Sequence, residues 1–134
     1  MLVKNFHDLP KELQCEAVRP YFELLNQKRG SLLCKSIFDR LMAAGMLIIL
    51  SPVFLVLAIM IKRDSEGEVF FRQIRVTQYG RTFGIYKFRT MVKNAESLGA
   101  QVTSQNDMRV TKVGNMLRSC RLDELPQLIN ILLG

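Results

Sequence analysis

Two adjacent carboxylates, Asp123 and Glu124, lie in the stretch RSCRLDELPQL (residues 118–128), between arginines and an apolar segment. An ionised aspartate can attack a phosphoryl group and form an acyl phosphate. A neighbouring glutamate can bind Mg²⁺, which bridges phosphate oxygens and reduces the charge repulsion facing an anionic nucleophile. The pair therefore permits phosphoryl chemistry, although Asp-Glu pairs are too common for adjacency alone to establish it.

A helix start explains the same pair structurally. Asp123 suits an N-cap position, because its side chain can accept a hydrogen bond from a first-turn amide, and Pro126 then lies within that turn. Apolar residues follow at helical spacing: Leu125, Leu128, Ile129 and Leu132. A helix N-terminus would also favour the ionised carboxylate and attract phosphate oxygens. At this point both explanations stay open.

The charge of the chain favours an anionic partner. Its 134 residues, the length of one domain, carry a net charge of +7 and a pI of about 9.7. Nucleic acid, phospholipid or a phosphorylated small molecule would suit this charge. The hydrophobic content of 49% excludes a disordered basic tail. One histidine and three cysteines without CxxC spacing argue against a zinc site.

One apolar block determines the class of protein. Leu41 to Ile61 contains 21 residues without a charge, enough for a helix to cross a hydrocarbon core of about 30 Å. The block begins far from the N-terminus and lacks a small-residue cleavage pattern, so it is not a signal peptide. A helix apolar on every side would need a larger protein to bury it, which disfavours a soluble core helix.

Ser51-Pro52 interrupts the centre of this block. Proline removes a backbone donor and kinks a helix, and a serine hydroxyl can bond the freed carbonyl. Basic residues, which mark the cytoplasmic side, flank the block at both ends: Lys35, Arg40, Lys62 and Arg63. A helix that enters the membrane, breaks at Ser51-Pro52 and returns is therefore favoured over a straight span.

Short elements are predicted on either side of the block. Before it, Asp8 is expected to cap a first helix, Pro20 to divide the region into two helices and Gly30 to end the second. After it, Val69 to Val76 and Thr82 to Phe88 read as a hairpin.

The predicted hairpin interleaves basic and aromatic residues. Such a surface could bind nucleic acid, lipid head groups or a diphosphate, or it could be a basic face exposed only to solvent. The nucleic-acid alternative conflicts with the apolar block, so no nucleic-acid partner is expected. Met91 to Gly99 is expected to begin a further helix.

Six stretches, in order from Lys35 onward, resemble the bacterial sugar transferases, the monotopic polyprenyl-phosphate phosphoglycosyl transferases. They are KSIFDR (35–40), SP (51–52), VFFRQ (69–73), YKFRTM (86–91), RVTKVG (109–114) and LDELPQL (122–128). The resemblance implies transfer of a sugar phosphate from a UDP-sugar to undecaprenyl phosphate, with release of UMP. It also implies a re-entrant membrane helix, and it leaves the sugar unspecified.

The resemblance implies roles for particular residues. Asp123 would be the nucleophile that forms a covalent phosphosugar intermediate, and Glu124 would be associated with Mg²⁺. Lys87 and Arg118 would bind substrate phosphates, with Arg89 a weaker candidate. The family is expected to continue beyond Gly134 into a segment like DMSLVGPRP, which supplies a further arginine, so we expect the printed sequence to hold part of the site.

Together these patterns predict an α+β, mostly helical chain. Residues 1–34 would form an amphipathic helical region, 35–63 the re-entrant helix with its kink at Ser51 and Pro52, and 64–134 a C-terminally incomplete catalytic domain with a short hairpin. The protein would lie at the cytoplasmic face of the bacterial inner membrane and contact its lipids. The alternative is a catalytically silent membrane-associated protein that binds lipid or a partner through its basic face.

Overall fold

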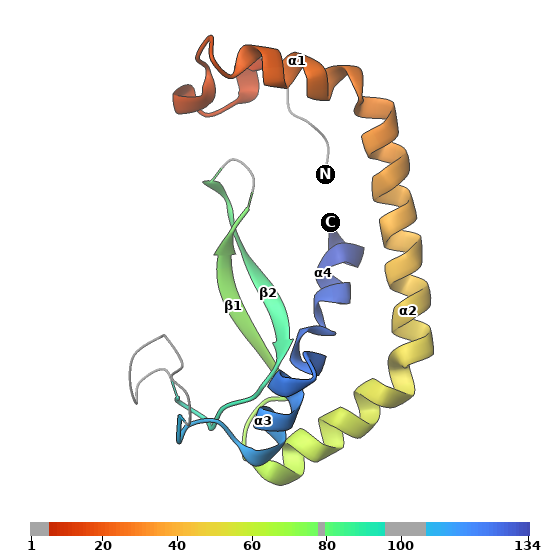
Figure 1. Cartoon of the computed structure of the whole chain (residues 1–134), viewed down its shortest axis with the longest axis vertical. Helices are drawn as coiled ribbons and strands as arrows, with labels where there is room; N and C mark the ends of the chain where they lie inside the picture. Colours follow the sequence, from red (N-terminus) through yellow and green to blue (C-terminus); the bar gives the residue numbers. More distant parts are fainter. Residues whose placement is uncertain (1–5, 78–79, 96–106) are drawn as a thin grey trace.

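One long helix dominates the computed structural model, which describes residues 6–77, 80–95 and 107–134 (Figure 1). Helix α2 spans Arg29–Asp64 and bends around the smaller elements that follow it. These are a hairpin of β1 (Phe70–Val76) and β2 (Thr82–Phe88), helix α3 (Lys112–Ser119), the 3-10 turn η4 (Leu122–Glu124) and helix α4 (Gln127–Leu133). The predicted α+β, mostly helical class is confirmed.

Helix α2 is continuous through Ser51-Pro52 and is not interrupted there. Pro52 has no N–H for the carbonyl of Ile48, four residues earlier. The Ser51 hydroxyl donates to that oxygen at 2.8 Å, as the sequence predicted. Figure 1 shows the helix turning sharply in its yellow part, which includes this stretch. Proline therefore bends α2 while serine satisfies the carbonyl that proline leaves without a donor.

The apolar surface of α2 is largely uncovered. By length and composition the helix could cross a membrane, and only 11% of its most apolar 18-residue window is buried within the protein. Ile48 and Ile49 are each 75% exposed. A core helix of a soluble domain would be mostly buried, so this surface indicates membrane association. Re-entrant insertion, with both ends on one side, stays a prediction.

The N-terminal region differs from its prediction in two details. It contains two 3-10 turns, η1 (Phe6–Asp8) and η2 (Lys11–Leu13), followed by helix α1 (Arg19–Gln27), which Pro20 opens as expected. Asp8 lies inside η1, and η2 begins after Pro10 without a side-chain cap. Gly30 ends no helix, because α2 already begins at Arg29. An exposed glycine can be accommodated there at a modest loss of stability.

The predicted hairpin is confirmed, with Phe70 paired to Phe88 and Phe71 to Lys87. Successive side chains alternate between the two faces, so Phe88 and Lys87 point to opposite sides. No helix begins at Met91, which instead forms a bridge to Val110. Residues 93–95 form a turn, and the rest of that predicted helix lies outside the described residues.

The core forms where the end of α2 meets the hairpin and α3. Leu57 and Ile61 pack with Phe88 and Leu117, all at most 5% exposed. The Phe54 ring adds a contact to Phe88, with centroids 5.2 Å apart. This burial joins α2 to both elements that carry predicted basic site residues.

Two polar contacts hold the start of α3, and one of them comes from α2. The Asp64 carboxylate at the end of α2 accepts the Val113 amide at 2.9 Å, and Thr111 caps α3 by accepting the Gly114 amide at 2.9 Å. Both bonds satisfy first-turn amides that have no partner within the helix. The start of α3 is therefore held by α2 as well as by its own cap.

Helix α4 lies between the hairpin and α2 (Figure 1). The Asn130 side chain accepts the Tyr86 amide at 2.8 Å and donates to the Gly84 carbonyl at 2.9 Å. A side chain of α4 thus makes the hydrogen bonds that a neighbouring strand would make to β2.

Gly114 is predicted to be essential for packing α3 against the end of the hairpin segment. A Cβ at this position would lie 2.0 Å from the Thr90 carbonyl oxygen, so Gly114→Ala must displace backbone. We expect a loss of about 3 kcal/mol in the free energy of unfolding, measured by denaturant titration in detergent. Gly30→Ala, in α2 with no atom within 4 Å of its Cβ, is the matched control and should be neutral or stabilising. Equal stability of the two variants would contradict the packing argument.

Re-entrant insertion predicts that both ends of α2 face the same side of the membrane. Cysteines introduced as Gly30→Cys and Glu66→Cys, after Cys15, Cys34 and Cys120 are changed to serine, should react only with reagent supplied from the cytoplasmic side. Gly30 lies in the first turn of α2 and Glu66 just after its last residue, so a straight span would expose one of them on the opposite side. Labelling of either cysteine in intact cells by an impermeant reagent would refute re-entry.

Candidate functional site

Asp123 lies inside a helical turn and does not cap a helix. The N-cap of η4 is Arg121, in the left-handed conformation at φ +54°, and the N-cap of α4 is Pro126. Neither helix start has a side-chain cap bond. Leu125 and Pro126 already have right-handed helical dihedrals, whereas an N-cap needs non-helical ones. The N-cap prediction for Asp123 is therefore wrong, and capping does not explain the carboxylate.

Glu124, the second carboxylate, pairs with Lys87 of β2. The Lys87 ammonium lies 3.2 Å from Glu124 Oε1, and the two side chains are 24% and 43% exposed. At this exposure the pair contributes little to stability. It does place a positive charge and a carboxylate together at the turn that carries Asp123.

The carboxyl of Asp123 has a raised pKa. Burial raises the pKa of its carboxyl above the ordinary value, and the nearby Glu124 charge raises it further. The positive charges of Lys87 and Arg118 and a backbone hydrogen bond oppose this rise in pKa. Asp123 is thus partly desolvated and near two cations, an arrangement that would suit a carboxylate nucleophile for an anionic substrate.

Arg118 is oriented by a buried hydroxyl. Its Nε donates to Thr90 Oγ1 at 2.9 Å, and Thr90 is 8% exposed. Within the part of the chain that the structure describes, the terminal nitrogens of Arg118 make no hydrogen bond. A guanidinium fixed through Nε can present those nitrogens as a fork to phosphate oxygens.

Arg89 is directed away from this group. Its guanidinium donates to the Ser65 carbonyl at 2.6 Å, to the Ser65 hydroxyl at 3.0 Å and to the Ile61 carbonyl at 3.4 Å. It also covers Gly67, whose φ is +124° and whose Cβ would lie 2.4 Å from Nη1. The structure thus places Arg89 at the end of α2, and its contact with substrate phosphate stays a prediction.

The structure brings together four predicted site residues from three elements: Lys87, Arg118, Asp123 and Glu124. Ser51 and Pro52 lie apart, in α2. Sequence reasoning missed Thr90 and Asn130. Thr90 lay within the matching YKFRTM stretch, whereas Asn130 gave only the weak signal of one amide among the apolar residues of α4.

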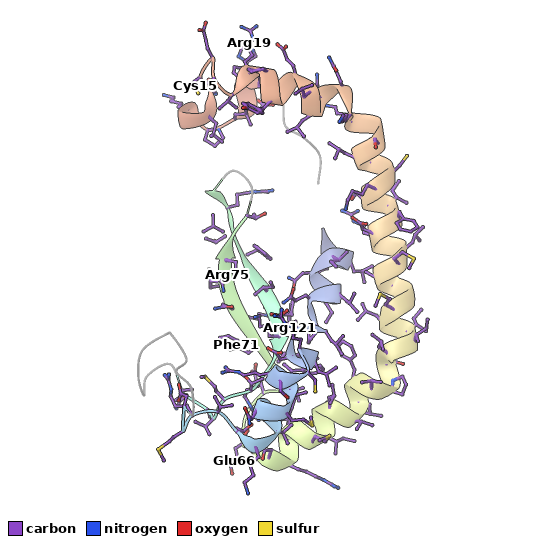
Figure 2. All side chains as sticks on the ribbon, in the orientation of Figure 1. Cys15, Arg19, Glu66, Phe71, Arg75 and Arg121 are labelled. Atoms are coloured by element: carbon purple, nitrogen blue, oxygen red, sulfur yellow. The ribbon has the colours of Figure 1, made fainter. Side chains whose placement is uncertain are left out.

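The hairpin carries further basic residues outside this group. Arg72 stacks on the Tyr86 ring at 4.5 Å, and Arg75 donates to Gln73 at 3.1 Å. Figure 2 shows Phe71 nearer the base of the hairpin and Arg75 nearer its tip, with Arg121 close to the base. These exposed cations extend the positive surface beyond the four site residues.

The profile of the family described as "Bacterial sugar transferase" matches residues 30–134. The chain belongs to this family. It is 46% identical over 112 residues to a UDP-N-acetylgalactosamine-undecaprenyl-phosphate N-acetylgalactosaminephosphotransferase of Aeromonas hydrophila, which covers 78% of this chain and 26% of the relative. It is 46% identical over 103 residues to the UDP-glucose:undecaprenyl-phosphate glucose-1-phosphate transferase of Escherichia coli K12, covering 76% of this chain and 22% of the relative.

A shorter relative is covered more fully. A putative undecaprenyl-phosphate N-acetylgalactosaminyl 1-phosphate transferase of Bacillus subtilis is 37% identical over 113 residues, which is 84% of this chain and 63% of the relative. This bacterial sugar transferase therefore spans about a quarter of its longer curated relatives and less than two thirds of the shorter one.

The carboxylates of this sugar transferase suit Mg²⁺ bound together with a substrate. Among residues 6–77, 80–95 and 107–134, no group of three or more histidine, cysteine, aspartate or glutamate side chains could form a metal cage. Mg²⁺ is usually bound through one or two carboxylates plus substrate phosphates, and Glu124 beside Asp123 offers that donor set. This donor set is compatible with Mg²⁺ that binds together with a diphosphate, and Mg²⁺ at Glu124 stays a prediction.

The raised pKa of Asp123 predicts a pH-dependent cost in stability. A carboxyl with a folded-state pKa above its unfolded value favours folding when protonated, and this contribution is lost as pH rises through the folded pKa. Asp123→Asn removes the charge, so the variant should melt a few degrees above the wild type at pH 7. The difference should shrink as the pH falls towards about 3.9, the ordinary aspartate pKa. Thermal unfolding followed by circular dichroism between pH 4 and 7 tests this.

Asp8→Asn, in the exposed turn η1, serves as the control and should change the melting temperature little at either pH. A lower melting temperature for Asp123→Asn at pH 7 would show that the ionised carboxylate stabilises the fold.

Proposed function

We propose that the protein transfers a sugar phosphate from a UDP-sugar to undecaprenyl phosphate through a covalent aspartyl intermediate, at the cytoplasmic face of the bacterial inner membrane. The observation that carries this proposal is the partly buried Asp123 carboxylate near Lys87 and Arg118. The names of the relatives supply the substrate classes, and the uncovered apolar surface of α2 supports lipid contact. A membrane site suits an acceptor whose polyprenyl chain is itself in the bilayer.

The proposed reaction has two displacements at one phosphorus. In the first, an Asp123 carboxylate oxygen bonds to the phosphorus next to the sugar, and the bond from that phosphorus to the bridging oxygen breaks. The bridging oxygen keeps the electron pair and leaves as part of UMP. In the second, a phosphate oxygen of undecaprenyl phosphate bonds to the same phosphorus, and the Asp123 carboxylate leaves with its electrons. The product is an undecaprenyl diphosphosugar, and Asp123 is regenerated.

The site residues reduce the charge problem in both displacements. An anionic carboxylate and an anionic phosphate must approach each other twice, and both approaches are repulsive. Lys87 and Arg118 place positive charge beside the phosphoryl oxygens, where preorganised cations stabilise the transition state. Mg²⁺ held by Glu124 would add positive charge at the same oxygens when bound.

Partial burial of Asp123 contributes in a second way. A less hydrated carboxylate needs to lose fewer water molecules before it attacks, so part of that cost is already met when the protein folds. The nearby cations keep the carboxylate ionised despite this burial, because they lower its pKa. Burial and positive charge together give a nucleophile that is both ionised and poorly hydrated.

A trapped intermediate would test the proposal directly. Protein given UDP-sugar without acceptor should gain the mass of one sugar phosphate on Asp123, with one UMP released per molecule. Asp123→Asn should show no adduct and should lose several orders of magnitude in turnover, because an amide cannot form the acyl phosphate. Glu124→Gln should regain part of its activity at high Mg²⁺. The control Asp8→Asn should form the adduct normally.

Turnover by Asp123→Asn at a rate close to wild type would exclude an aspartyl intermediate. Absence of UMP release by the wild type across a panel of UDP-sugars would instead favour the silent lipid-binding alternative.

A further inference from the structure

Asn130 makes an unusual connection between α4 and the hairpin. Its amide accepts from the Tyr86 N–H at 2.8 Å and donates to the Gly84 carbonyl at 2.9 Å. Both backbone groups lie on β2, which pairs with β1 alone among the described strands, so its other edge would otherwise have unpaired groups. The Asn130 side chain thus accepts from one residue of the strand edge and donates to another residue two positions away.

These two bonds fix a register between the two halves of the site. Tyr86 directly precedes Lys87 on β2, and Asn130 lies six residues after Glu124. Pro126, between Glu124 and Asn130, is fully buried. If α4 slid by one residue along β2, the amide would face the wrong backbone groups and Lys87 would lose its 3.2 Å contact with Glu124.

We propose that Asn130 is a positioning residue that sets the register between the lysine-bearing strand and the turn carrying Asp123 and Glu124. Its bidentate bond to the edge of β2 holds Lys87 against the carboxylates. This inference rests on the proposed transferase function, because its effect is measured on the covalent step, yet the register itself is a property of the fold.

The position of Lys87 has a measurable consequence for the covalent step. Its ammonium lies 3.2 Å from Glu124 Oε1, at the turn that carries Asp123, where a preorganised cation would stabilise charge on the phosphoryl oxygens of the donor. Displacing Lys87 would therefore slow the covalent step without removing the nucleophile.

The experiment compares Asn130→Ala, Lys87→Ala, the double variant and the wild type in single-turnover UMP release, using the full chain in detergent. We expect the Asn130→Ala rate constant to fall by about 10- to 100-fold, and to fall much less when Lys87→Ala is already present, because both changes disrupt the same contact. Losses that simply multiply in the double variant would contradict the positioning role. Asn115→Ala, at an exposed asparagine of α3, is the matched control and should keep the wild-type rate.

Hydrogen exchange supplies a readout independent of activity. In Asn130→Ala the Tyr86 amide should exchange faster, while the amides that pair β2 with β1 keep their protection. Asn130→Gln keeps the amide but adds a methylene group, so it should give a smaller change in both rate and exchange.

Several results would overturn the positioning role. One is a reduced burst amplitude with a normal rate constant, since Asn130 would then only maintain the folded fraction. Unchanged Tyr86 exchange in Asn130→Ala is another. If the alanine variant does not fold, the glutamine variant carries the test, and its failure to fold would make Asn130 a general stabilising residue. A wild type that releases no UMP refutes the transferase proposal instead, and exchange of the Tyr86 amide in Asn130→Ala then decides the register.

Discussion

The contact between the last turns of α2 and the small domain is the constraint on which the other features depend. Phe88 and Leu117 are buried there against Leu57 and Ile61. Each of the two has a site residue as its chain neighbour, Lys87 before Phe88 and Arg118 after Leu117. The burial that attaches the domain to α2 therefore also determines where both cations point. With side chains this closely packed, movement at the core would be transmitted to the site.

The site illustrates a conflict between stability and chemistry. Burial of the Asp123 carboxylate opposes its ionised form, and the adjacent Glu124 adds repulsion. A sequence selected for stability alone would place a neutral residue here, so the local cost is typical of a functional position. The compensation comes from parts of the fold distant in sequence: a lysine on β2, an arginine on α3 and the buried hydroxyl that orients it.

Much of the architecture follows from local patterns. The β-branched and aromatic residues between two turn signals predicted the hairpin. The length of the uncharged apolar block predicted a long apolar helix. The Ser51 bond to Ile48 followed from what proline lacks. Contacts between residues far apart in the sequence could not be predicted. Arg89 was expected near phosphate but donates to the Ser65 carbonyl just after α2. Asn130 makes hydrogen bonds to residues 44 and 46 positions earlier in the chain. The N-cap assignment of Asp123 failed because Arg121 adopts a left-handed conformation and starts the helical turn before it.

The contacts of Arg89 have an electrostatic consequence. The guanidinium lies at the C-terminal end of a 36-residue helix, where the aligned peptide dipoles leave partial negative charge. Its Nε and Nη1 are buried without a hydrogen-bond partner among the described residues, and its remaining nitrogen bonds two carbonyls and a hydroxyl. Neither peptide carbonyls nor serine hydroxyls titrate in the physiological range. The hairpin is therefore joined to the membrane-associated helix by a cation that bonds peptide carbonyls and a hydroxyl, and this connection uses no carboxylate.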